Sequence, residues 1–113
     1  MSPLPLNPIA ADVCVAPQLP PEAMAELAAL GFKSVVNNRP DFEGGPDQPT
    51  SAQIEAAALA AGLQYRHLPV AGGYQSPDEV AAFRTLVADL PHPLLAFCRS
   101  GARSTRLYQL AQG

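Results

Sequence analysis

The chain has 113 residues, 48% hydrophobic and 15% charged, and its 7 basic and 10 acidic residues give a net charge of −3. These values predict one globular domain over residues 1–113, and the absence of a basic stretch argues against nucleic-acid binding. No apolar run reaches membrane-spanning length, no signal peptide is evident, and two cysteines do not suggest a disulfide scaffold. We therefore expect a cytoplasmic protein with no membrane partner.

Two strands and two helices are predicted in the first half of the chain. In chain order they are an edge strand at Asp12–Val15, a helix at Glu22–Leu30, a buried strand at Ser34–Val36 and a helix from Thr50 to Ala61. Pro20-Pro21 opens the first helix and Gly31 ends it. Thr50 and Gln53 have the spacing of a capping box, which fixes the start of the second helix.

The second half continues the alternation. It is predicted to contain a half-buried strand at Leu63–Leu68, a helix from Pro77 to about Asp89, a strand at Leu94–Phe97 and a helix from Ser104 to about Ala111. Ser76 and Glu79 form a second capping box, and Ser104 is expected to cap the last helix.

This alternation of helices and strands is typical of an α/β fold with a mostly parallel sheet and helices on both faces. Ligands of such sheets bind beyond the carboxyl ends of the strands. Three loops should meet there: Asn37–Asp47, Pro69–Gln75 and Cys98–Arg103.

The loop that begins at Cys98 carries the clearest chemical signal. It joins a strand to a helix through Gly101, so its backbone N–H groups and the helix N-terminus should form an anion cradle. A cysteine there should be an acidic, accessible thiol, and Arg103 can offer a planar fork to an oxyanion. The segment predicts a thiolate nucleophile beside an anion site, with no cofactor and no cluster of metal-ligand spacing.

Other loop residues are candidates for holding the substrate: Arg99, Ser100, Gly101, Ala102 and Ser104. The Ser100 and Ser104 hydroxyls could stabilise the thiolate, whereas Arg99 is either a second anion contact or a solvated residue. On the first loop, Arg39 and Asp41 either line the site or pair with each other at the surface.

Three stretches, Val35–Asp41, Gly62–Val70 and Phe97–Ser104, occur in the order typical of dual-specificity and tyrosine phosphatases. The chain most resembles the phosphatase-like domain of bacterial beta-lactamase-hydrolase-like proteins over about residues 8–112. The resemblance implies a protein-tyrosine-phosphatase-like three-layer fold, with Cys98 as nucleophile and Arg103 as the oxyanion-binding arginine.

Two features depart from the phosphatase pattern. Tyrosine phosphatases place five residues between cysteine and arginine, whereas this chain has four, the spacing of many rhodanese-type sulfurtransferases. The stretch Ala71–Tyr74, where such phosphatases usually carry an acidic aspartate, has no carboxylate. Asp41, Asp78 and Glu79 are the remaining candidates for a general acid, and Asp41 is preferred because its loop follows a strand.

Three functions stay open at this stage. The first is a cysteine-dependent phosphatase-like hydrolase acting on phosphate monoesters. The second is a sulfurtransferase that carries a persulfide on Cys98 and needs a sulfane-sulfur donor. The third is a non-catalytic module that binds a small oxyanion or senses redox state. The first ranks narrowly ahead, because the family resemblance favours it.

Overall fold

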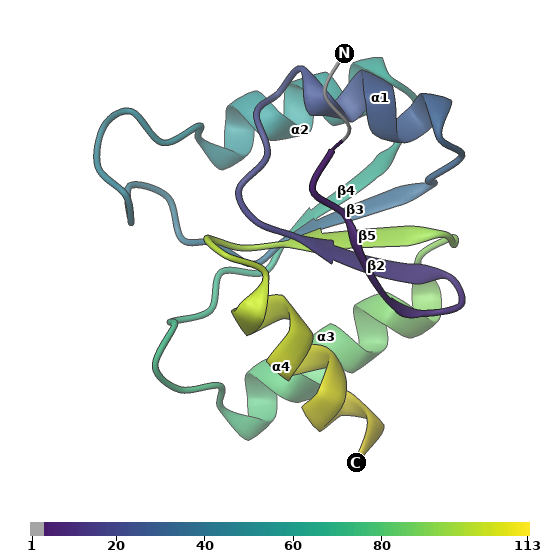
Figure 1. The fold of residues 1–113 in the computed structure, drawn as a ribbon. Helices are drawn as coiled ribbons and strands as arrows, with labels where there is room; N and C mark the ends of the chain where they lie inside the picture. Colours follow the sequence, from purple (N-terminus) through teal and green to yellow (C-terminus); the bar gives the residue numbers. More distant parts are fainter. Residues whose placement is uncertain (1–3) are drawn as a thin grey trace.

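The computed structural model describes residues 4–113 and contains one five-stranded sheet with the order β1-β2-β5-β3-β4 (Figure 1). The strands are β1 (Asn7–Ala10), β2 (Val13–Ala16), β3 (Ser34–Asn37), β4 (Gln64–His67) and β5 (Leu94–Phe97). β5 lies at the centre, and all four of its residues are buried, as expected for a parallel strand covered on both faces.

The sheet is parallel except at one edge. β2, β5, β3 and β4 run in the same direction, and β1 pairs with β2 antiparallel. The strand predicted at residues 12–15 is present as β2, but it is not an edge strand, because β1 takes that place. β1 was missed because it contains Pro8, and proline within a run argues against a central strand but is tolerated at an edge.

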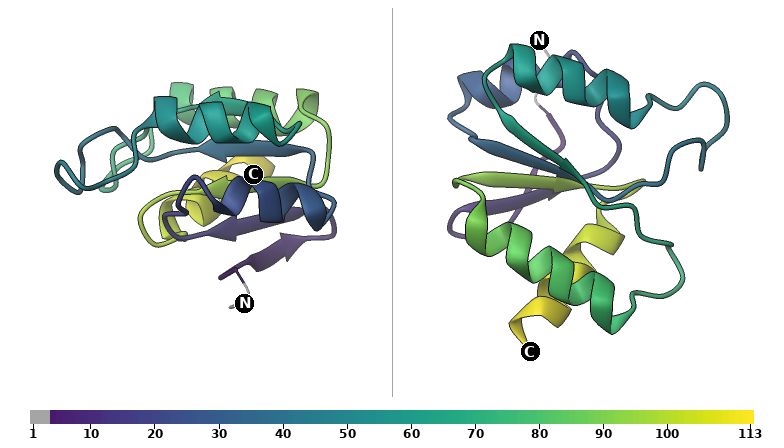
Figure 2. Two further views of the ribbon diagram at one scale, coloured as in Figure 1. Left: turned by 90° about the horizontal axis from the view of Figure 1, so that it is seen from above. Right: turned by 180° about the vertical axis from the view of Figure 1, so that it is seen from behind.

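Four helices cover the two faces of the sheet: α1 (Ala23–Ala29), α2 (Ser51–Ala60), α3 (Pro77–Asp89) and α4 (Ala102–Gln112). α1 and α2 lie on one face and α3 and α4 on the other (Figure 2). Met24, Leu27 and Ile54 are fully buried beneath the first pair, and Phe83 and Leu107 beneath the second. The structure confirms the predicted α/β architecture.

The helix starts show how local sequence sets the element boundaries. Both predicted capping boxes are present, at Thr50 for α2 and at Ser76 for α3. α4 instead begins two residues before its predicted start, and Gly101 is its N-cap without a side-chain cap. The prediction that Ser104 caps this helix is wrong, because Ser104 lies inside its first turn.

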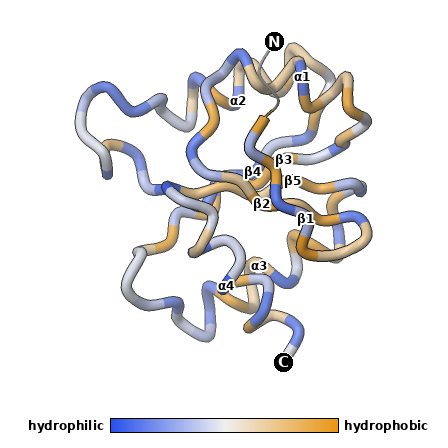
Figure 3. The backbone as a smooth tube through the Cα atoms, in the orientation of Figure 1, coloured by the Kyte–Doolittle hydropathy of each residue, from blue (hydrophilic) through white to orange (hydrophobic). Residues whose placement is uncertain are grey.

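The carboxyl ends of the parallel strands meet at one edge of the sheet, where the loops after β3, β4 and β5 leave it (Figure 1). The loop from β3 to α2 is hydrophilic over much of its length and extends away from the body of the molecule (Figure 3). Across residues 4–113, no helix is long and apolar enough to cross a bilayer.

Candidate active site

Hydrogen bonds to neighbouring strands and loops hold the Cys98 loop at the sheet edge. The Cys98 N–H donates to Ala16 O at 3.3 Å, and the Gln18 N–H donates to Arg99 O at 3.2 Å. On the other side of β5, the Asn38 N–H donates to Phe97 O at 2.8 Å. The loop is therefore fixed from both sides, which gives the Cys98 thiol a defined position.

Gly101 allows the chain to turn directly into α4. Its φ of +95° lies in the left-handed region that favours glycine. A Cβ atom at this position would lie 3.5 Å from the backbone of Ala16. The conformation aims the Gly101 N–H at Cys98 Sγ, 3.0 Å away.

Hydrogen bonding makes Cys98 an acidic thiol. Burial alone would raise its pKa, but the backbone N–H groups of Ser104, Gly101 and Ser100 and the Ser104 hydroxyl outweigh burial and lower that pKa. The prediction that this thiol is accessible is wrong, because Cys98 is only 1% exposed.

Ser104 links the Cys98 loop to the loop after β3. Its hydroxyl donates to Asn38 Oδ1 at 2.8 Å, and both residues are fully buried. One hydroxyl proton serves one acceptor at a time, so Ser104 bonds either Asn38 or the Cys98 thiolate. The Asn38 amide also donates to Leu68 O, directly after β4, at 3.1 Å.

Arg103 lies beside this loop with its side chain only 9% exposed. Its Nη1 donates to Val70 O at 3.0 Å, and its Nη2 lies 3.0 Å from Glu43 Oε1. Its buried Nε has no hydrogen-bond partner within residues 4–113. In this structure two of the three guanidinium nitrogens are therefore engaged by protein groups, and the third is buried without a partner.

Glu43 lies between two arginines. Its Oε1 lies 3.0 Å from Arg39 Nε and 3.0 Å from Arg103 Nη2. Partial burial alone would raise the pKa of this carboxyl, but the hydrogen bonds and charges of Arg103 and Arg39 hold it below its ordinary value. Glu43 is thus a carboxylate at neutral pH.

The side chains of the remaining predicted site residues on these two loops bind partners other than Cys98 and Arg103 or are exposed. Arg39 pairs with Glu43 rather than with Asp41, whose Oδ1 accepts the Ser51 N–H at 2.7 Å at the start of α2. Arg99 is exposed, in agreement with a solvated residue. The exposed Ser100 hydroxyl accepts the Ala102 N–H at 3.4 Å.

The two acid candidates on α3 lie in its first turn. There the Glu79 carboxylate accepts the Ser76 N–H at 2.8 Å, so it is part of the capping box, and Asp78 is exposed beside it. Neither carboxylate is among the contacts of Arg103 within residues 4–113.

Sequence reasoning missed Asn38, Glu43 and Gly72. Gly72 lies against Arg103, because a Cβ atom there would be 3.1 Å from Nη2. Glu43 is one of several carboxylates in a long polar loop. Its contact with Arg103, 60 residues later, depends on the tertiary fold and has no local sequence signal. Across residues 4–113, no group of three or more His, Cys, Asp or Glu side chains is placed to hold a metal ion.

Comparison with known proteins identifies the family. The model of the phosphatase-like domain of beta-lactamase hydrolase-like proteins matches residues 6–113. The chain belongs to this family. A beta-lactamase hydrolase-like protein of Agrobacterium fabrum is 41% identical over 86 residues, which are 76% of this chain and 20% of the relative. The chain therefore matches only about a fifth of the length of that relative.

Solved structures agree with this assignment. A putative phosphatase from Neisseria meningitidis superposes with a TM-score of 0.89 at 31% identity, covering 97% of this chain and 78% of that one. A putative phosphatase from Shewanella putrefaciens gives a TM-score of 0.80 at 20% identity, covering 96% and 68%, and shares the fold. The domain is phosphatase-like, and these findings lend no support to the sulfurtransferase alternative.

Proposed function

We propose that this domain is a cysteine-dependent phosphatase that hydrolyses phosphate monoesters, with Cys98 as nucleophile and Arg103 as the oxyanion-binding group. The observation that carries the proposal is a thiol that accepts the Gly101 N–H at 3.0 Å and has a lowered pKa, on a loop that leads directly into the helix carrying the Arg103 guanidinium. A thiolate attacks and an arginine fork binds oxyanions, so together they suit phosphoryl transfer.

In the proposed reaction, the phosphate oxygens bind the loop N–H groups and Arg103. Cys98 Sγ then attacks phosphorus, a sulfur–phosphorus bond forms, and the bond to the ester oxygen breaks. The departing oxygen takes a proton from an acid. Water then attacks the cysteinyl phosphate, which releases inorganic phosphate and restores the thiolate.

We assign the acid to Asp41. The stretch Ala71–Tyr74 holds no carboxylate, and two arginines keep Glu43 ionised, which makes it a poor proton donor. Asp41 lies two residues away on the same loop, is exposed and holds one backbone N–H. Hydrogen bonds in a ligand-free site commonly rearrange when substrate binds, so the Ser51 contact does not bar this role.

A paired assay tests the proposal. The protein should hydrolyse p-nitrophenyl phosphate and show no comparable transfer of sulfur from thiosulfate. Cys98→Ser should abolish hydrolysis, and Cys14→Ser is the matched control, because Cys14 lies within β2 and not on the Cys98 loop. Sulfur transfer that depends on Cys98, without phosphate release, would replace the proposal with the sulfurtransferase. If the protein shows neither activity, the remaining alternative is an anion-binding module.

A further inference from the structure

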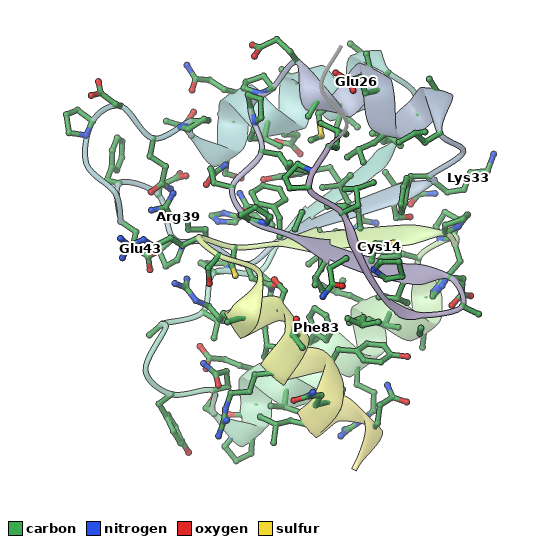
Figure 4. The ribbon with its side chains drawn as sticks, viewed as in Figure 1. Cys14, Glu26, Lys33, Arg39, Glu43 and Phe83 are labelled. Carbon is green, nitrogen blue, oxygen red and sulfur yellow. The ribbon has the colours of Figure 1, made fainter. Side chains whose placement is uncertain are left out.

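The carboxylate of Glu43 occupies a position that suits an anion. A single oxygen, Oε1, receives N–H groups from two guanidinium groups, Arg39 Nε and Arg103 Nη2, each at 3.0 Å. Figure 4 shows Arg39 and Glu43 close together at the edge of the sheet. A phosphate oxygen bound there would make the same charge-assisted hydrogen bonds.

The two arginines are held in place independently of Glu43. Arg39 Nη1 donates to Gln18 Oε1 at 3.1 Å, and Arg39 as a whole is 8% exposed. Arg103 Nη1 donates to Val70 O at 3.0 Å. Each guanidinium therefore keeps one hydrogen bond to another part of the protein if the Glu43 side chain moves away.

Glu43 is the movable member of the three. Its side chain is 27% exposed, against 9% for each arginine, and it belongs to the long loop between β3 and α2. Its Oε1 makes the contacts to both arginines, so rotation of one side chain breaks both. Arg39 Nε and Arg103 Nη2 would then lose their shared partner and could bind another anion.

We propose that Glu43 is an internal competitor of the substrate: its carboxylate occupies Arg103 in the free protein and must leave for a phosphate group to engage both arginines. This deepens the proposed function, because it rests on Arg103 as the anion-binding group. It makes Glu43 the residue that sets phosphate affinity, by direct competition and by repulsion of a second negative charge.

Glu43→Gln tests the competition, because the amide keeps the shape of the side chain and removes its charge. The probe is inorganic phosphate, measured by the concentration that half-protects Cys98 from alkylation at pH 7 and low salt. We expect the half-protecting phosphate concentration to be at least about threefold lower in Glu43→Gln than in the parent protein, since a neutral amide binds two guanidinium groups poorly. KM for p-nitrophenyl phosphate should fall in parallel.

Asp47→Asn is the matched control. It removes the same charge from an exposed position of the same loop, so any effect of net charge alone appears in both variants. Phosphate protection in Asp47→Asn should stay within about twofold of the parent protein. Equal tightening in both variants would overturn the proposal, because loop charge would then explain the result.

Weaker or unchanged protection in Glu43→Gln would also overturn it, and a weaker value would make Glu43 a positioning residue for Arg103. Phosphate protection does not require turnover, so it separates the two proposals. Tighter protection in a protein without phosphatase activity supports the competition and refutes the proposed function. Normal turnover with unchanged protection in Glu43→Gln supports the proposed function and refutes the competition. If phosphate protects Cys98 in neither the parent protein nor Glu43→Gln, the competition is also refuted.

Discussion

Gly72→Ala tests whether the loop after β4 holds the Arg103 guanidinium in its working position. A Cβ atom at residue 72 would lie 3.1 Å from Arg103 Nη2, whereas ordinary contact begins at 3.4 Å. The guanidinium must therefore move by a few tenths of an ångström, against its hydrogen bonds to Val70 and Glu43. Misplacement by about 1 Å costs about 10²-fold in rate, so this smaller shift predicts about a three- to tenfold loss in kcat/KM.

Gly73→Ala is the control for this prediction. A Cβ atom at residue 73 has nothing within 4 Å, and the substitution has the same effect on the flexibility of the unfolded chain. The assay is kcat/KM for p-nitrophenyl phosphate, with thermal unfolding measured for both variants. Equal activity in Gly72→Ala and Gly73→Ala would refute the claim that the glycine backbone positions Arg103.

Three further predictions concern the site. Asp41→Asn should slow hydrolysis of an alkyl phosphate by about 10²-fold or more and that of p-nitrophenyl phosphate much less, because only a poor leaving group needs the proton; equal losses would exclude Asp41 as the acid. The pH profile of alkylation should have its midpoint below that of a free thiol at Cys98, whose pKa is lowered, and above it at Cys14, whose pKa burial raises, with mass spectrometry separating the two sites. Ser104→Ala should shift the Cys98 midpoint upward and cost about 1–3 kcal/mol of unfolding free energy by leaving buried Asn38 Oδ1 unpaired; an unchanged midpoint would show that the hydroxyl serves Asn38 alone.

Local sequence signals were enough for most of the fold. The capping boxes at Thr50 and Ser76 set the starts of α2 and α3, and an apolar run bounded by proline and cysteine set β5. β1 was not predictable in this way, because antiparallel pairing with β2 overrides the proline at residue 8. The start of α4 was misplaced because a left-handed glycine, rather than a serine side chain, ends the loop.

The site was predictable where the chemistry is local to one loop. The acidic thiol follows from N–H groups within six residues of Cys98, and the sequence indicates that arrangement. The partners of Arg103 were not predictable, because Val70 and Glu43 reach it from loops 33 and 60 residues away. Burial of Cys98 was missed because it also depends on tertiary packing.

The central claim is that Cys98 carries the phosphoryl group, and the direct measurement is the chemical state of Cys98 during turnover. The protein is mixed with p-nitrophenyl phosphate, denatured within milliseconds and examined by mass spectrometry of the Cys98 peptide. The account predicts a phosphate adduct on Cys98 that accumulates before steady state and is absent from Cys98→Ser. A persulfide in place of phosphate after exposure to thiosulfate, or phosphate release that persists in Cys98→Ser, would contradict it.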